Sequence, residues 1–290
     1  MNSIAAIDPP AKDADFVTAL ARGMRILTCF GVGETELGNG QIARRSGLPP
    51  ATVARLTHTL TELGYLRNVP HRPKYALSAQ VLSIGYPVLA GLPERELARP
   101  HLKALADATG GSVCMAVAEG LRAVYIEVSR GIDAGQLPDI GVRRPLLDSS
   151  VGRALFVDMD RAEQAAVLNQ SCLQQPERAE VLRQGAQQAI DDQARYGMCR
   201  TENLVMMGWS AVAMPLRGLG GHRFAVSLGV RSDRVPADDF MRRVGLPLSA
   251  AVSRMTSAFQ ARQRREAGAQ IVPAARSAAS WSAAMPSNSP

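Results

Sequence analysis

Cysteines, aromatic residues and long apolar runs are all scarce in this 290-residue sequence. Aromatic residues make up only 4% of it. No apolar run reaches the roughly 18 residues that a membrane span needs. The N-terminal segment is acidic rather than basic, which argues against a signal peptide. No CxxC spacing predicts a zinc site or a redox pair, and scattered thiols fit a reducing cytoplasm. The isolated cysteines are Cys29, Cys114, Cys172 and Cys199.

Signatures of catalysis are also missing. His222 is the only histidine after His101, and it lies in a glycine-containing loop. The chain shows no nucleophile elbow, metal-ligand spacing or phosphate loop. We therefore expect a non-enzyme without metal or cofactor. The alternative is a small-molecule hydrolase or isomerase that uses the C-terminal domain, with the N-terminal unit as an appendage. A turnover assay over a panel of organic acids would detect such an activity.

Positive charge is present and unevenly distributed. The formal net charge is +7, and residues 16–78 hold eight Lys or Arg against three Asp or Glu. Residues 79–260 hold twenty against nineteen, so this longer segment is almost neutral. An excess of basic residues confined to one segment is what binding to phosphates requires.

Residues 41–66 carry the most informative pattern. Gly47 is placed to end a short helix, and Pro49 with Pro50 fits the start of a second one. On that second helix an apolar face recurs at helical spacing, formed by Val53, Leu56, Leu60 and Leu63. Ala51, Arg55 and His58 lie roughly opposite, with Thr52 on the flank, and these four are the candidate DNA contacts of the helix. A buried face, a basic face and a glycine-containing turn predict a helix-turn-helix.

A basic hairpin follows directly. Two short apolar strands, Tyr65-Leu66 and 75–77, flank a proline-containing loop. The loop places Arg67, Arg72 and Lys74 where they could contact phosphates or a minor groove. Together the two motifs predict a winged helix-turn-helix that binds DNA. The alternative from the same pattern is a small helical bundle with a solvated charged face.

The remaining chain predicts an α+β domain. Strand-like runs at 112–119, 123–129, 211–216 and 224–230 are interrupted by helical segments, so a mainly antiparallel sheet is expected. We expect a helix at 18–30 with Leu20, Met24 and Leu27 facing inward, and a closing helix at 238–262. The predicted domains are a flexible arm at 1–15, a winged helix-turn-helix at 16–78, a kinked linker helix at 79–95, an effector-binding domain at 96–262 and a disordered tail at 263–290.

The motifs in order resemble the IclR family of bacterial transcriptional regulators. The resemblance covers about residues 17–260 and rests on the first helix (LARGMRIL), on IARRSGLP leading into TVARL, on LGY, on ELARP, and on GRAL after RPL. It implies a winged helix-turn-helix, a linker helix and a GAF-like effector domain, acting as a homodimer or a dimer of dimers. It also implies that a small organic molecule, often a carboxylic acid from a catabolic pathway, alters operator binding.

The resemblance further implies where that effector binds. Trp209, beside the implied pocket, is a candidate for ligand stacking or for the core. The residues carried over by position are Leu146, Leu147, Asp148, Ser149, Ser210, Ala211, Ser227 and Gly229. Here the chain departs from the common pattern, because many members have a His-Cys or similar pair at 147–148 and a cysteine at Ala211. Asp148 would repel a carboxylate unless Arg143, Arg144 or a helix start offsets its charge.

These observations predict a ligand-responsive regulator of a catabolic operon whose effector is a small, possibly aromatic, acid. Members of the family act as repressors, activators or both. A third hypothesis is a DNA-binding protein that needs no effector. Thermal stabilisation of the C-terminal domain by a ligand would distinguish the first from the third.

Overall fold

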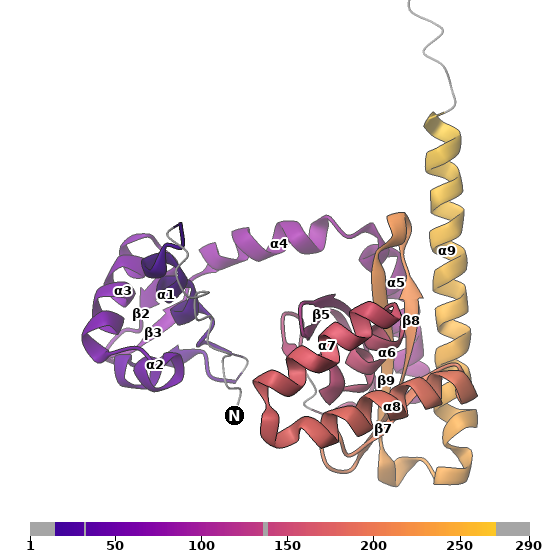
Figure 1. Ribbon diagram of the computed structural model, residues 1–290. Helices are drawn as coiled ribbons and strands as arrows, with labels where there is room; N and C mark the ends of the chain where they lie inside the picture. Colours follow the sequence, from indigo (N-terminus) through magenta and orange to yellow (C-terminus); the bar gives the residue numbers. More distant parts are fainter. Residues whose placement is uncertain (1–14, 32, 136–138, 271–290) are drawn as a thin grey trace, which may run out of the picture. The chain divides into compact units, whose positions relative to one another are not determined.

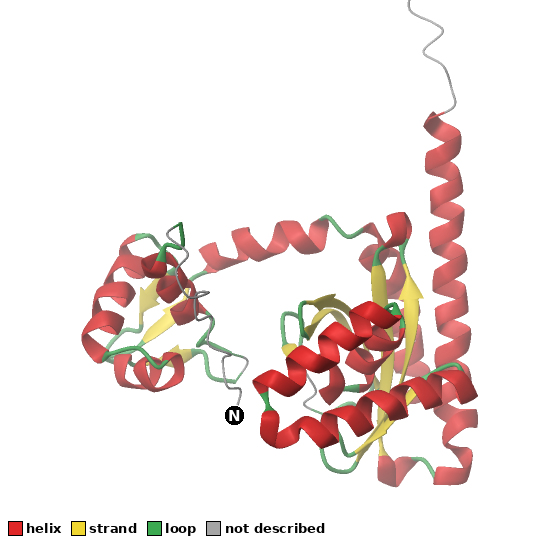
Figure 2. Cartoon of the chain, viewed as in Figure 1, coloured by secondary structure: helices red, strands yellow, loops and turns green. Residues whose placement is uncertain are grey.

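The computed structural model describes residues 15–31, 33–135 and 139–270, and the chain folds as two units divided between Leu92 and Pro93 (Figure 1). The expected flexible arm, apart from Asp15, and the tail beyond Gln270 lie outside the described residues. Both units combine helices with strands (Figure 2). Among the described helices, none combines the length and the apolar character that a bilayer crossing requires.

The first unit has the predicted winged helix-turn-helix topology. Its small sheet is antiparallel in the order β1-β3-β2, and helices α1, α2 and α3 pack together beside it. Strand β1, which lies between the first helix and the helix-turn-helix, was not predicted. The elements are α1 Thr18–Leu27, β1 Glu36–Leu37, α2 Asn39–Ser46, α3 Pro50–Glu62, β2 Leu66–Asn68 and β3 Tyr75–Leu77.

The turn between α2 and α3 forms as the sequence predicts. Gly47 adopts φ 67°, in the left-handed region, and its N–H donates to the Ala43 carbonyl at 2.9 Å. Pro49 and Pro50 then start α3 where no N–H is needed. The core beneath is mainly apolar, with Ile26, Leu37, Ile42, Val53 and Leu66 at most 2% exposed.

Two details of this unit differ from expectation. On α1 the buried positions are Gly23 and Ile26, whereas Leu20 and Met24 are 65% and 46% exposed. The apolar residues of α1 therefore form a wider stripe than the core can cover. Leu63, expected on the buried face of α3, follows the end of that helix and is 56% exposed.

The linker is a separate short helix. After a 3₁₀ turn at Ala79–Val81, helix α4 spans Leu82–Ala90 and keeps both Gly85 and Pro87 inside it. The break falls instead at Gly91 and Leu92, and α5 begins with a proline at the first helical position. The second unit accordingly begins at Pro93 rather than at residue 96, and Glu94 is 1% exposed within it.

The second unit contains a six-stranded antiparallel sheet. Its order is β6-β5-β4-β9-β8-β7, so β7 forms one free edge. The longer strands match the four predicted runs, whereas β6 and β7 are short and polar and carry no clear alternation. The strands are β4 Ser112–Glu119, β5 Arg122–Arg130, β6 Arg143–Pro145, β7 Cys199–Glu202, β8 Trp209–Arg217 and β9 Arg223–Arg231.

Helices cover both faces of this sheet. Helices α5 and α9 lie side by side on one face, where large side chains such as Met115, Phe224 and Leu228 are fully buried (Figure 1). Helix α6 covers the other face, and α8 packs behind α6 and against β7. This face carries small residues, including Cys114 and Ala213. The helices are α5 Pro93–Thr109, α6 Ser150–Val157, α7 Arg161–Gln174, α8 Ala179–Tyr196 and α9 Leu246–Gln270.

The closing helix extends beyond its predicted end at residue 262. Residues 263–270, expected to be disordered, continue α9 as far as Gln270. Arg262 Nε and Glu266 Oε1 form an ion pair at 2.7 Å one turn apart. The sequence there is rich in good helix formers and has no proline, and Gly268 is its one poor helix former, so the helix continues although it has few large apolar residues to bury. The expected start at 238 is a 3₁₀ turn followed by a π turn at Met241–Gly245.

Candidate DNA-binding surface and ligand sites

The outer face of α3 carries exposed residues with no partner in the described structure. Ala51, Arg55 and His58 are exposed and Thr52 is half-buried. The Arg55 guanidinium makes no hydrogen bond or ion pair within the described residues. The opposite face is anchored by Thr57, whose hydroxyl donates to Asn39 Oδ1 at 3.1 Å. The helix therefore presents one basic, unpaired side chain to an outside partner.

The wing forms from β2, β3 and the turn between them. Val69 N–H donates to the Lys74 carbonyl at 2.9 Å, which closes the hairpin. Arg67 and Arg72 are exposed and Lys74 is half-buried. Arg72 lies 3.2 Å from a Glu36 carboxylate oxygen on β1. An exposed pair of this kind contributes only about 0–1 kcal/mol, so a phosphate could displace it.

The second unit gathers polar groups under α6, at residues that we call the inner cluster: Cys114, Tyr125, Arg144, Ser149 and Ser227. Ser227 Oγ lies 3.2 Å from Cys114 Sγ on the neighbouring strand. Burial raises the pKa of the Tyr125 phenol, opposed by the Arg144 charge and by hydrogen bonds from Ser149 and Arg144. Ser149 and Ser227 thus lie in one cluster, with Tyr125 and Cys114 between them.

Arg144 gives the inner cluster its charge. Its Nε is buried and has no hydrogen-bond partner in the described part of the chain. A buried donor left unpaired is costly, which favours an added acceptor at this point. Ser149 is only partly available, because its Oγ accepts the Gly152 N–H at 3.1 Å as the cap of α6.

Asp148 does not face the inner cluster as an unpaired charge. Arg178 reaches it with two hydrogen bonds of 2.9 Å and 2.7 Å, one to each carboxylate oxygen. This bidentate pair raises the pKa of Arg178. The expected repulsion of an acidic ligand by Asp148 is therefore offset by Arg178, a residue that the sequence pattern did not single out.

The other residues implied for the pocket are spread more widely. Leu146 packs beside the inner cluster, but Leu147 packs instead with Phe156 and Leu182. Trp209 lies 3.9 Å from the position that a Cβ on Gly229 would take, next to Ala211 on the same face. Ser210 faces the opposite side, where its hydroxyl lies 2.8 Å from that of Ser232. The structure therefore brings together part of the implied set.

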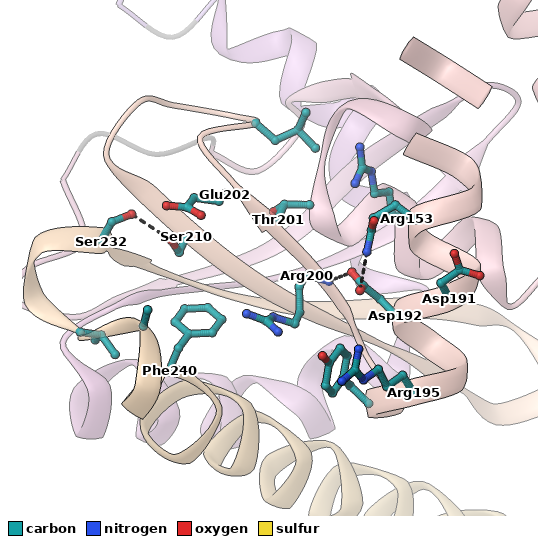
Figure 3. Close-up of a pocket in the computed structure, with 15 residues that line it drawn as sticks. Arg153, Asp191, Asp192, Arg195, Arg200, Thr201, Glu202, Ser210, Ser232 and Phe240 are labelled. Carbon is teal, nitrogen blue, oxygen red and sulfur yellow. Dashed lines mark hydrogen bonds between the residues drawn. The ribbon is translucent and has the colours of Figure 1, made fainter. Parts of the chain in front are cut away.

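A cleft lies along the free edge of β7, and we call it the edge cleft (Figure 3). It has a volume of about 720 Å³, and Ser210 is the one residue of the implied pocket that lines it. Helix α8, strand β7 and the segment from Ser232 to Phe240 supply most of its walls. Its arginines are Arg153, Arg195 and Arg200.

Several of these residues were missed at the sequence level. Tyr125, Arg144 and Arg200 lie in strands whose polar residues carry no motif, and only Arg144 was considered, as a possible partner of Asp148. Their importance depends on strand register, which sequence spacing alone does not define. Within the described residues, no group of three or more His, Cys, Asp or Glu is placed to hold a metal.

A winged helix-turn-helix with an exposed basic helix, on the same chain as a second domain with helices on both faces of an antiparallel sheet, defines a DNA-binding transcriptional regulator. The family models for the IclR helix-turn-helix domain and the bacterial transcriptional regulator IclR C-terminal domain match residues 19–70 and 87–265. The chain belongs to the IclR family of bacterial transcriptional regulators.

Individual relatives agree with this membership. The chain is 34% identical over 209 residues to the HTH-type transcriptional regulator TsaQ1/TsaQ2 of Comamonas testosteroni, covering 71% of this chain and 75% of that one. It is 29% identical to the Pca regulon regulatory protein of Pseudomonas putida, covering 83% and 84%. The crystal structure of an IclR family transcriptional regulator from Brucella abortus is similar, with a TM-score of 0.71, 36% identity and coverage of 85% and 94%.

Proposed function

We propose that this protein regulates a catabolic operon in the cytoplasm by binding an operator, and that a small organic acid in its second unit controls this binding. The proposal is carried by two features that occur on the same chain. One unit has an exposed Arg55 without a partner, and the other has a buried Arg144 nitrogen without a hydrogen-bond partner. Two relatives are named as regulators, one of them of a regulon, which supports the same role.

For the operator contact, α3 enters the major groove with Arg55 toward the base edges. Arginine is the common reader of guanine because its two donors match O6 and N7. Ala51 and Thr52 lie at the start of α3, where no side chain caps the helix. The backbone N–H groups of this first turn can therefore bind a phosphate. His58, Arg67, Arg72 and Lys74 supply backbone or minor-groove contacts, which orient the unit without reading sequence.

For the effector, the inner cluster accepts the acidic group. Arg144 offers an unpaired N–H, and Tyr125, Ser149 and Ser227 offer hydroxyls around it. Ser149 stands at the first turn of α6, where the helix dipole also favours negative charge. Leu146 and Trp209 supply apolar surface nearby, which suits an acid with an apolar or aromatic body.

One experiment tests both halves. Fluorescence anisotropy would follow binding of the full-length protein to DNA taken from upstream of its own gene and of the neighbouring operon, with and without a panel of organic acids. We expect saturable binding to one such fragment, with an affinity that at least one acid changes. We expect Ser149→Ala and Ser227→Ala to weaken the response to that acid.

The outcomes separate the alternatives. Operator binding that no acid changes would favour the effector-independent hypothesis, and turnover of an acid would favour the enzyme hypothesis. An acid that acts on both serine variants as strongly as on the unchanged protein would show that the inner cluster is not the effector site. The sign of the response distinguishes a repressor from an activator.

Assembly completes the proposal. Most of the exposed large apolar side chains of the first unit lie on α1 and α4, where Leu20, Leu82 and Tyr86 are 65%, 70% and 66% exposed. Exposed apolar residues gathered along a helix are typical of an interaction surface. We propose that they form the contact of a homodimer, or of a dimer of dimers, that reads paired half-sites.

A further inference from the structure

The edge cleft contains positive charge that the protein leaves unpaired. Neither Arg153, Arg195 nor Arg200 forms an ion pair with any described residue. Arg153 uses its Nε to donate to the Leu147 carbonyl at 3.2 Å, and burial lowers the pKa of its guanidinium. Guanidinium groups held in a partly desolvated site gain strongly from a carboxylate or similar anion, because they offer two parallel donors.

Arg200 is held in position by aromatic rings. Its guanidinium carbon lies 5.2 Å from the centre of the Tyr196 ring and 5.6 Å from that of Phe240. Figure 3 shows the Arg200 side chain running across the cleft toward Phe240. Arg195 stacks on Tyr196 as well, at 5.1 Å. Stacking restricts the side chain but leaves the guanidinium edge able to donate, so little rotamer entropy remains to be lost on binding.

The acidic residues of the cleft are mostly engaged. Asp192 accepts two hydrogen bonds, one on each carboxylate oxygen: from the Gln188 side-chain amide at 2.8 Å and from the backbone N–H of Arg200 at 3.0 Å. Asp191 is exposed and accepts the Gln187 amide at 2.9 Å. Glu202 is exposed at the end of β7. Asp192 therefore ties α8 to β7, whereas Asp191 and Glu202 stay exposed, and the three cleft arginines form no ion pair with any of these carboxylates.

We propose that the edge cleft is a second ligand site, separate from the inner cluster, for a small organic anion with a flat apolar body. The acidic group binds Arg200, with Arg153 and Arg195 adding positive charge around it. The body packs against Leu204 and Val235, which line the same cleft. The volume of about 720 Å³ lies within the range typical of small-molecule sites.

The test compares benzoate with benzamide, a neutral molecule of nearly the same shape, on the full-length protein. Isothermal titration calorimetry would measure binding to the unchanged protein and to Arg200→Gln, Arg195→Gln and Arg153→Lys. Arg183→Gln is the matched control, because Arg183 lies on the same helix as Arg195 but is exposed and pairs with Glu180. Ser227→Ala shows whether benzoate binding depends on the inner cluster.

We expect benzoate to bind the unchanged protein and benzamide not to bind at the cleft. Loss of a charged hydrogen bond should weaken benzoate about tenfold in Arg200→Gln, with smaller losses in Arg195→Gln and Arg153→Lys. Arg183→Gln and Ser227→Ala should leave this benzoate site unchanged. Arg195 and Arg200 are not buried, so these two variants keep the test valid if Arg153→Lys unfolds.

Four results would overturn the proposal. The first is an absence of benzoate binding at millimolar concentration. The second is equal weakening in Arg183→Gln, which would show a general effect of net charge. The third is binding lost in Ser227→Ala but unchanged in Arg200→Gln, which would confine the acid to the inner cluster. If Arg200→Gln alters only the sedimentation coefficient, the cleft is a subunit contact and the proposal also fails.

Discussion

Arg55 is the side chain on which DNA recognition most depends. It is exposed on α3 and has no partner within the described structure, so its removal disturbs no internal contact. We predict that Arg55→Ala weakens operator binding by about 1–3 kcal/mol and relaxes sequence preference. Anisotropy titrations against the operator and a scrambled fragment would measure both effects, with unchanged thermal unfolding as the check on folding.

Arg161→Ala provides the comparison for this variant, because Arg161 is an exposed arginine on α7 in the second unit. It removes the same charge and should change operator affinity little. Unaltered operator affinity in Arg55→Ala, with the fold intact, would contradict the assignment of α3 as the recognition helix.

The cysteines should differ sharply in reactivity. Burial raises the pKa of the Cys114 thiol to about 11 and that of Cys199 to about 12, and it also raises that of Cys29. Cys172 is the only one of the four that is not buried. We predict that iodoacetamide at about pH 8 labels Cys172 first, because the thiolate is the reactive form. Timed labelling followed by mass spectrometry would give the order.

The same shifts give a direction for alkaline stability. A raised pKa means that the folded state holds the thiol proton more tightly than the unfolded chain does. The contribution from Cys114 and Cys199 is therefore complete below their ordinary pKa of 9.0, and it is lost as pH rises through about 11 to 12. Early labelling of Cys114 in folded protein would contradict the buried placement.

At the scale of elements, substitutions at two glycines of the first unit should change its stability in opposite directions. Gly47 has φ 67° and no atom within 4 Å of a would-be Cβ, so Gly47→Ala suffers backbone strain alone. Gly23 lies inside α1, also with nothing within 4 Å. We predict that Gly47→Ala destabilises the first unit by about 1 kcal/mol and that Gly23→Ala stabilises it by about 0.4–1 kcal/mol.

Denaturant unfolding of the two variants beside the unchanged protein would measure these differences. Because neither substitution meets a neighbouring atom, packing cannot explain a difference in sign. A stabilised Gly47→Ala would mean that this residue does not hold the left-handed conformation in solution.

The elements that sequence could predict are those with a strong local signal. Gly47, the proline pair after it and the apolar spacing of α3 specify the helix-turn-helix without help from distant residues. The long strands β4, β5, β8 and β9 were found by their apolar runs. Strands β6 and β7 were not, because Arg143–Pro145 and Cys199–Glu202 are short and polar and are defined only by pairing with a neighbour.

At the scale of the whole molecule, the candidate sites were less predictable than the fold. Ser149 and Ser227 were implied together by family resemblance, and the structure connects them through Tyr125 and Cys114. Asp148 could not be judged from its own surroundings, because its partner Arg178 lies 30 residues away along the chain. Likewise, the edge cleft exists only where α8 and the segment before α9 meet the end of the sheet.

Assembly is the last property that belongs to the whole molecule. Leu82 is 70% exposed on α4, next to other exposed apolar residues of the first unit. We predict that Leu82→Glu, which places a charge in the proposed dimer contact, shifts the protein toward monomer and lowers operator affinity through the loss of paired half-site binding. Sedimentation velocity at micromolar concentration would measure the first effect and anisotropy the second.

Leu173→Glu is the matched control, because Leu173 is 81% exposed on α7 and lies outside the proposed contact. It changes another highly exposed leucine to the same charged residue, so it should leave both the sedimentation coefficient and operator affinity unchanged. A Leu82→Glu protein that remains dimeric would move the contact away from α4. A protein that is monomeric before substitution, yet binds its operator with full affinity, would show that one winged unit is sufficient.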